Sequence, residues 1–239
     1  MREDKDLFVI SEYFRQVADN DDIRYEAEKI FADTGDVEKV NEYCKKIILK
    51  QRAIKYLEQS RIDKRFKTRT FETFKVYNEK TKQAKAAALD YANHIHEHLE
   101  SGKNLIIAGS GCVGTGKTHL ACAVAQRAME NGVPAKFINV VSMISEIKEN
   151  FSVKKFTDIE LLIIDDFGKE KSTDWVKETV YSIINKRYEK MLPTVITTEG
   201  TIEAMTSHYE DKGKAILSRI CEDFRFIELN GEDYRKRRE

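Results

Sequence analysis

Residues 111–118 read G-C-V-G-T-G-K-T, which is the pattern G-x-x-x-x-G-K-T of a phosphate-binding loop. The glycines let the backbone turn tightly and bring its N–H groups to a phosphate without a Cβ in the way. Lys117 can reach the β- and γ-phosphates of a nucleotide, and the Thr118 hydroxyl can ligate Mg²⁺. We therefore expect ATP and Mg²⁺ to bind here, with the nucleotide held by Gly111, Val113, Gly114, Thr115, Gly116, Lys117, Thr118 and His119.

The residues on either side of the loop support this interpretation. Residues 105–108 (L-I-I-A) are apolar, so a buried strand leads into the loop. Residues 119–125 (H-L-A-C-A-V-A) continue as a helix, and its N-terminal dipole would face the phosphates. A glycine-rich turn that binds nothing is the alternative, but a match between a strand and a helix favours the phosphate loop.

Composition bounds the classes of protein to consider. The chain has 239 residues, enough for one α/β domain and a smaller appendage. Its 41 basic and 41 acidic residues balance, so a contact with nucleic acid must come from a local patch. No apolar stretch is long enough for a membrane span, and the four cysteines form no C-x-x-C pair. We expect a cytoplasmic protein without membrane contacts.

Apolar runs alternate with helical patterns after residue 100. This alternation predicts an α/β fold with a five-stranded parallel sheet and helices on both faces. The predicted helices comprise residues 78–100, the segment after the loop to about 131, 142–150 with Ser142 as its cap, 173–190 with Ser172 or Thr173 as its cap, 202–209 and 214–221. The predicted strands are 104–109, 135–140, 161–166, 194–198 and 224–229.

The first 60 residues predict a small helical domain. Two short helices are expected at 6–18 and 22–33, followed by a longer helix with one apolar stripe: Val37, Val40, Cys44, Ile47, Ile54 and Leu57. The stripe fits either a helical hairpin that packs on itself or a helix that docks on another protein.

A basic and aromatic linker, residues 61–77, joins this domain to the ATPase domain at 78–239. Its interleaved basic and aromatic residues could bind nucleic acid. We favour the alternative that Phe66, Phe71 and Phe74 dock on the ATPase core, because this stretch joins the two domains.

An acidic pair, Asp165-Asp166, ends the third apolar run. Ligands of open α/β sheets lie beyond the carboxyl ends of the strands, so these acids should lie beside the phosphate loop. Asp165 can hold Mg²⁺ through water, as the Walker B acid does, and Asp166 can polarise the attacking water. A strand that merely ends in solvent at two acids is the alternative. Together the two motifs predict an ATPase in which Lys117 and Asp166 are catalytic.

Other classes of phosphate-loop protein lack support in the sequence. A GTPase should carry N-K-x-D, whereas residues 185–188 read N-K-R-Y within a predicted helix. The L-S-G-G-Q-like signature of transporter ATPases is not in the sequence. Small-molecule kinases usually lack paired acids at the end of a buried strand. Ring-forming ATPases remain.

Several motifs together resemble a known family, the AAA+ ATPases of the DnaC/DnaI helicase-loader and IstB transposition-helper group. The resemblance covers about residues 60–238. It rests on residues 60–74, 114–121 (G-T-G-K-T-H-L-A), 161–168 (L-L-I-I-D-D-F-G), 184–188 (I-N-K-R-Y), 193–198 (P-T-V-I-T-T) and 217–220 (L-S-R-I).

The resemblance implies further site residues. Arg219 matches an arginine finger that reaches the γ-phosphate of a neighbouring subunit. The sensor position at the end of the fourth strand is usually polar, often Asn, and here Thr198 or Glu199 occupies it. If it is Glu199, negative charge approaches the γ-phosphate and hydrolysis is slow. Arg235 matches a nucleotide-sensing position near the C-terminus.

The same resemblance implies a function: an ATP-dependent replication protein from a phage or mobile element that loads a replicative helicase onto single-stranded DNA. The N-terminal helices would bind the helicase, and the subunits would assemble in a ring or spiral. The segment that would contact DNA, residues 141–160, is short, and its basic residues are Lys148, Lys154 and Lys155. Two alternatives remain: an IstB-like transposition helper, and an ATP-binding adaptor with little hydrolysis, for which Glu199 is the argument.

Overall fold

The computed structural model describes residues 12–59, 67–109 and 113–234. The chain forms two compact units, of which the first extends to Lys55 and the second begins at Tyr56. The division falls within a helix of 23 residues, Val37–Gln59. The partner-binding role predicted for residues 1–60 stays a prediction.

The first unit is helical and has its own small core. It contains α2 (Glu12–Val17), α3 (Asp21–Thr34) and the first part of α4 (Val37–Gln59). Val40 and Cys44 of the predicted stripe are fully buried, so this part of the stripe packs within the unit, whereas the side chains of Ile54 and Leu57 lie outside the described ones. The buried core residues are Phe14, Val17, Ala18, Ala27, Val40, Cys44 and Ile48.

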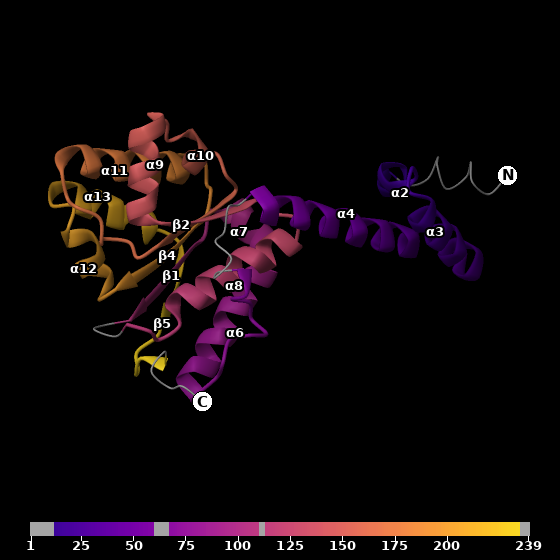
Figure 1. Ribbon diagram of the computed structural model, residues 1–239, viewed down its shortest axis with the longest axis horizontal. Coiled ribbons are helices and arrows are strands. Elements are labelled where there is room, and N and C mark those ends of the chain that lie inside the picture. The colour runs from indigo at the N-terminus through magenta and orange to yellow at the C-terminus, as the bar shows by residue number, and fades with distance from the viewer. Residues whose placement is uncertain (1–11, 60–66, 110–112, 235–239) are drawn as a thin grey trace. The chain divides into compact units, whose positions relative to one another are not determined.

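The second unit is built on a five-stranded sheet, which confirms the predicted fold (Figure 1). The strand order is β2-β3-β4-β1-β5, and all four pairs are parallel. Every residue of β1 and β3 is buried, as their apolar sequences predict for strands covered on both faces. The strands are β1 (Asn104–Gly109), β2 (Ala135–Asn139), β3 (Leu161–Asp165), β4 (Thr194–Glu199) and β5 (Phe224–Glu228).

Helices cover both faces of the sheet. In Figure 1, α6 and α8 lie on one side and α9, α11 and α13 on the other. The second group packs on alternate residues of β1, β2, β3 and β4. The helices are α6 (Glu79–Asn93), α7 (Ile95–Ser101), α8 (Lys117–Glu130), α9 (Val140–Asn150), α10 (Lys154–Thr157), α11 (Asp174–Glu189), α12 (Ile202–Ser207) and α13 (Asp211–Ile220). Within the described ranges, no helix is both long and apolar enough to cross a membrane.

Two local expectations were wrong. The single helix predicted at residues 78–100 is divided at His94, which ends α6 and precedes α7. Helix α9 begins earlier than predicted, because Asn139 caps it by accepting a hydrogen bond from the Val141 N–H at 3.0 Å, in place of Ser142. By contrast, Thr173 caps α11 as expected and accepts from the Val176 N–H at 3.3 Å.

A buried arginine on α11 contacts the segments that lead into β3 and β4. Arg187 on α11 is 1% exposed, and burial lowers the pKa of its guanidinium. Its Nε, Nη1 and Nη2 all donate hydrogen bonds, so the charge is solvated by main-chain carbonyls and a hydroxyl. The acceptors are the Thr194 Oγ1 and the carbonyls of Phe156, Ile159, Glu160 and Pro193, at 2.6 to 3.1 Å.

We expect Arg187→Met to destabilise the second unit by about 3 kcal/mol or more, because several buried carbonyls would lose their donor. Lys186→Met, at the exposed neighbouring position, is the matched control and should change stability little. Urea unfolding followed by circular dichroism measures both. Equal midpoints for the two variants would contradict a structural role for Arg187.

Candidate functional site

Parallel pairing brings the polar strand ends to one edge of the sheet. Asn139 at the end of β2 lies in register with Asp165 at the end of β3. Gly109 at the end of β1 lies in register with Glu199 at the end of β4. The phosphate loop follows β1, so the acidic pair and the loop meet at the same edge, as the sequence predicts.

A cavity of about 400 Å³ opens at this edge. Such a volume lies within the range of small-molecule sites. Gly116, with φ 102°, precedes the N-terminus of the 14-residue helix α8, which favours an anion there. The lining residues are Arg69, Thr73, Phe74, Lys75, Tyr77, Val113, Gly114, Thr115, Gly116, Lys117, Thr118, His119, Asp166, Lys169, Glu199 and Tyr234. Gly111, also predicted to bind nucleotide, lies outside the described residues.

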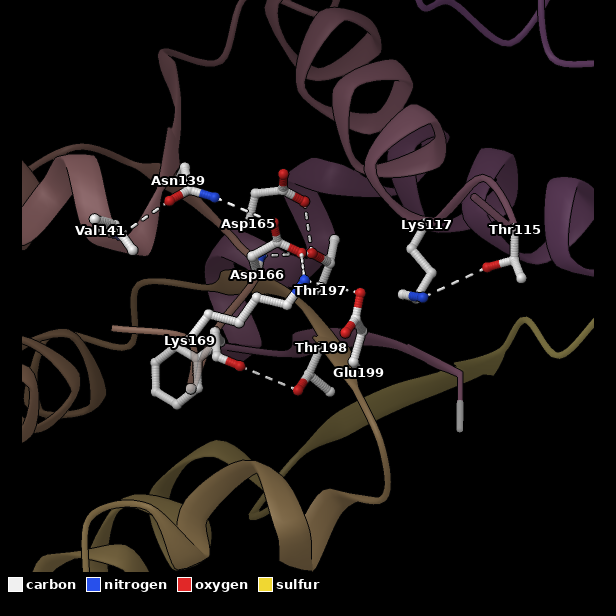
Figure 2. A network of polar contacts seen from close by, with 12 residues as sticks. Thr115, Lys117, Asn139, Val141, Asp165, Asp166, Lys169, Thr197, Thr198 and Glu199 are labelled. Carbon is white, nitrogen blue, oxygen red and sulfur yellow. Dashed lines mark hydrogen bonds and ion pairs between the residues drawn. The ribbon is translucent and has the colours of Figure 1, made fainter. Parts of the chain in front are cut away.

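Lys117 forms part of the wall of this cavity. It is 7% exposed, and its Nζ donates to the Thr115 Oγ1 at 3.5 Å (Figure 2). Its ammonium therefore lies beside the phosphate loop, as the motif predicts.

Thr118 and Asp165 form a site that fits Mg²⁺. Asp165 is 4% exposed, and burial raises the pKa of its carboxyl. Hydrogen bonds from the hydroxyls of Thr197 and Thr118 oppose this rise in pKa, while the charge of Asp166 adds to it. Oxygen ligands from a hydroxyl and a buried carboxylate match the preference of Mg²⁺, and a dication would compensate the burial of the acid.

Asp166 is the acid that faces the cavity. Its backbone has φ 58°, in the left-handed region, and its N–H donates to the Thr197 Oγ1 at 2.9 Å. The Asn139 Nδ2 donates to one carboxylate oxygen at 3.3 Å, and the Lys169 Nζ lies 3.2 Å from the other (Figure 2). The side chain is 30% exposed, so it is accessible to a water molecule.

Thr197, which we did not predict, is the strand-end hydroxyl that reaches the acidic pair. Its Oγ1 donates to the Asp165 Oδ1 at 2.6 Å and accepts from the Asp166 N–H. The predicted sensor Thr198 is 1% exposed, and its hydroxyl donates to the Phe167 carbonyl at 3.1 Å. Since side chains alternate along a strand, Thr197 and Glu199 share a face that Thr198 does not. This alternation was the signal that could have identified Thr197.

Glu199 lies at the cavity as an ion pair. Its Oε1 is 2.8 Å from the Nζ of Lys169, and Lys169 lies in the turn after β3. Burial opposes the charge of Lys169, but the hydrogen bonds that its ammonium donates to Glu199 and Asp166, together with their negative charges, outweigh burial, so the pKa of the amine is raised. Lys169 is a second residue that the sequence motifs did not indicate.

The described part of the linker, residues 67–77, packs on the phosphate loop and α8. The His119 Nε2 lies 2.9 Å from the Thr70 carbonyl and 3.2 Å from the Thr73 Oγ1. Burial lowers the pKa of His119, against the opposing effect of the Thr70 carbonyl. A Cβ on Gly116 would lie 2.8 Å from the buried Phe74 ring. Of the predicted docking of Phe66, Phe71 and Phe74 on the ATPase core, that of Phe74 is therefore observed, and Phe66 lies outside the described residues. Nucleotide binding by His119 stays a prediction.

The C-terminal segment also reaches the cavity. The ring of Tyr234 stacks on Tyr77 with centroids 4.1 Å apart, and its N–H donates to the Gly114 carbonyl at 3.3 Å. The Asn78 Nδ2 donates to the Tyr234 hydroxyl at 3.1 Å. Arg235, the predicted sensor next to Tyr234, lies outside the described residues.

Arg219 does not line the nucleotide cavity of its own chain. It borders a separate cavity of about 310 Å³, together with residues at the start of β1 and β4. Its Nε donates to the Asn185 Oδ1 at 2.5 Å, and its guanidinium lies over the Tyr181 ring, 5.1 Å from the centroid. A role in the site of a neighbouring subunit stays a prediction.

Comparisons with known proteins agree with this geometry. The family model described as IstB-like ATP binding protein matches residues 37–239. The phage-like element PBSX protein XkdC of Bacillus subtilis (strain 168) is 31% identical over 150 residues, which cover 58% of this chain and 56% of that protein. The replicative helicase loader DnaC of Escherichia coli (strain K12) is 25% identical over 178 residues, or 70% of this chain and 69% of that protein.

A solved structure shares the fold. The crystal structure of the DnaC helicase loader matches with a TM-score of 0.59 at 24% identity, and the match covers 70% of this chain and 99% of that chain. At this level of identity the match supports the fold and leaves the site residues to be argued from their own contacts.

We expect Thr197→Val to lower ATP turnover by about ten- to a hundredfold, because the acidic pair would lose the hydroxyl that positions it. Thr198→Val is the matched control. It removes a hydroxyl that contacts the Phe167 carbonyl, and it should leave turnover within about twofold. Steady-state phosphate release measures both. A larger loss of turnover in Thr198→Val than in Thr197→Val would support Thr198 as the sensor.

Proposed function

Because the chain belongs to the IstB-like ATP-binding protein family and shares the AAA+ fold of the DnaC helicase loader, we propose that it is an ATPase that loads a replicative helicase onto single-stranded DNA. The observation that carries the ATPase proposal is the meeting of Lys117, Thr118, Asp165 and Asp166 at one edge of the sheet. Each contributes a separate part of phosphoryl transfer.

The residues at this edge of the sheet divide the chemistry between them. Lys117 and the N-terminus of α8 bind and orient the phosphates. Thr118 and Asp165 would hold Mg²⁺, which would neutralise charge on the phosphate oxygens. Asp166 accepts a hydrogen bond from the attacking water, and its contacts with Asn139 and Lys169 fix the carboxylate.

Arg219 supplies the remaining positive charge from a neighbouring subunit. The guanidinium lies away from its own nucleotide cavity and is held by Asn185 and Tyr181 on α11. Because it lies away from the nucleotide cavity of its own chain, Arg219 can act only on a nucleotide of an adjacent molecule, and only if the subunits assemble. We therefore propose hydrolysis that is slow in the monomer and requires a ring or spiral.

Subunit mixing tests this proposal. Lys117→Ala should abolish ATP binding, and Arg219→Ala should lower turnover by about 10³-fold, the effect of an arginine finger. Mixed together, the two variants should recover measurable ATPase activity, because an Arg219→Ala site can receive the arginine of a Lys117→Ala neighbour. An Arg219→Ala variant with normal turnover, or a mixture that recovers nothing, would rule out the finger in trans.

The contact with DNA is proposed at the end of α9. Phe151 there is 92% exposed, with φ 50° at the helix C-cap. An exposed aromatic ring beside basic residues is suited to stack on an unpaired base. Lys148 and Lys154 are the neighbouring basic residues in the sequence, and the Lys148 Nζ lies over the Trp175 ring, 5.4 Å from its centroid.

The contact with a helicase is proposed at the N-terminal unit. Tyr13 and Tyr25 are 39% and 65% exposed on it, although the unit already buries its own core. Exposed tyrosines are typical of protein interfaces. A second candidate partner is a transposase, because the resemblance to the IstB transposition helpers implies one.

We expect the full chain to transfer the replicative helicase of the same genome to a single-stranded oligonucleotide in an ATP-dependent way. Phe151→Ala should weaken binding to the oligonucleotide about tenfold or more while helicase binding is kept. Phe226→Ala, an exposed aromatic on β5, is the matched control. Gel shift and helicase pull-down measure the two steps. Transfer of a transposase in place of the helicase would support the transposition helper.

A further inference from the structure

A carboxylate in a phosphate site needs a compensating charge. Glu199 lines the same cavity as Lys117, at the end of β4. Left unpaired, it would repel the terminal phosphate of ATP, which is the argument that the sequence raises for an adaptor without hydrolysis. The structure pairs Glu199 with Lys169, at 2.8 Å between Oε1 and Nζ.

Lys169 contacts two acids at once. Its Nζ is also 3.2 Å from the Asp166 Oδ1, and Figure 2 shows the side chain extending past Asp166 toward Glu199. The turn that carries it is closed by a hydrogen bond from the Lys169 N–H to the Asp166 carbonyl at 3.2 Å. The side chain is 41% exposed, and Lys169 lines the cavity.

We propose that Lys169 is a second phosphate-binding cation of the nucleotide cavity, that it discriminates ATP from ADP, and that Glu199 positions it. This inference rests on the proposed ATPase function and adds to it a residue that recognises the third phosphate. The two ammonium groups come from different elements: Lys117 from the phosphate loop and Lys169 from the turn after β3.

The contact with Asp166 indicates which phosphate Lys169 meets. Asp166 acts on the water that attacks the γ-phosphate in the proposed mechanism. A cation 3.2 Å from its carboxylate therefore lies at the γ end of the nucleotide. ADP has no phosphate there, so it should not depend on Lys169.

Glu199 has a double effect in this arrangement. While Lys169 is present, Glu199 holds the ammonium at the cavity wall, and the ammonium compensates the negative charge of Glu199. When Lys169 is removed, Glu199 and Asp166 both remain as uncompensated anions facing the phosphates. The effects of substitutions at 169 and 199 should therefore be strongly non-additive.

The test measures the affinity of the full chain for Mg²⁺ with ADP and with an ATP analogue whose β,γ bond resists hydrolysis, by calorimetry. Lys169→Met should weaken binding of the analogue roughly tenfold, the effect of losing one charge-assisted hydrogen bond, and change ADP binding by less than about twofold. The double variant Lys169→Met with Glu199→Gln should recover part of the loss, because a neutral amide does not repel the phosphate.

Lys103→Met is the matched control. Lys103 pairs with Asp223 at 3.1 Å with similar exposure, and it does not line the nucleotide cavity. It should leave both affinities unchanged. Thermal unfolding of each variant verifies the fold.

The inference alone would be overturned if the ratio of ATP-analogue to ADP affinity were unchanged in Lys169→Met, whether neither affinity changes or both fall by the same factor. In either case wild-type binding and its loss in Lys117→Ala would leave the proposed function standing. A wild-type chain that binds neither nucleotide would overturn the proposed function and the role of Lys169 together.

Discussion

Parallel pairing of β3 with β2 and β4 places three strand ends side by side. The candidate site at this edge of the sheet depends on the pairing. The register puts Asn139 beside Asp165. It also lets the Thr197 hydroxyl reach across to the same acid at 2.6 Å. A shift of one residue in either pair would turn these side chains to the opposite face of the sheet. The geometry of the site is therefore a property of the whole sheet, to which the loop and the acidic pair are attached.

The site carries more negative charge than a nucleotide cavity tolerates without compensation. Asp165 is buried, Asp166 lies next to it, and Glu199 ends the neighbouring strand. Each acid has different partners. Asp165 accepts hydrogen bonds from hydroxyls, Asp166 contacts Asn139 and Lys169, and Glu199 forms an ion pair with Lys169. Such distributed pairing orients Asp166 without burying it, as the proposed general-base role requires.

The linker and the C-terminal segment are part of the nucleotide site in the second unit. Phe74 packs on Gly116, and Tyr234 donates to the Gly114 carbonyl. The phosphate loop is thus contacted by two segments far apart in the sequence, and both line the same cavity. A nucleotide that alters the loop must also alter these contacts, since interiors are close-packed. This gives a physical route by which bound ATP can affect the segments next to the sheet.

Much of the fold and the main motifs could be predicted from the sequence. Contiguous residues form the phosphate loop, the acidic pair and the buried strands. Their backbone geometry is set locally, by glycines, by apolar runs and by the ends of strands. Helix boundaries were less certain, because a capping residue such as Asn139 competes with nearby candidates such as Ser142.

Tertiary structure alone decided which side chains meet. Thr197 and not Thr198 reaches the acids because of the face on which the strand presents it. Lys169 pairs with Glu199, 30 residues later, because the turn after β3 lies beside the end of β4. These contacts depend on register and on packing between distant segments, and no spacing in a single sequence encodes them. The motifs for ATP and Mg²⁺ can be recognised in contiguous residues of this chain, whereas the arrangement of the charges around them follows from the fold.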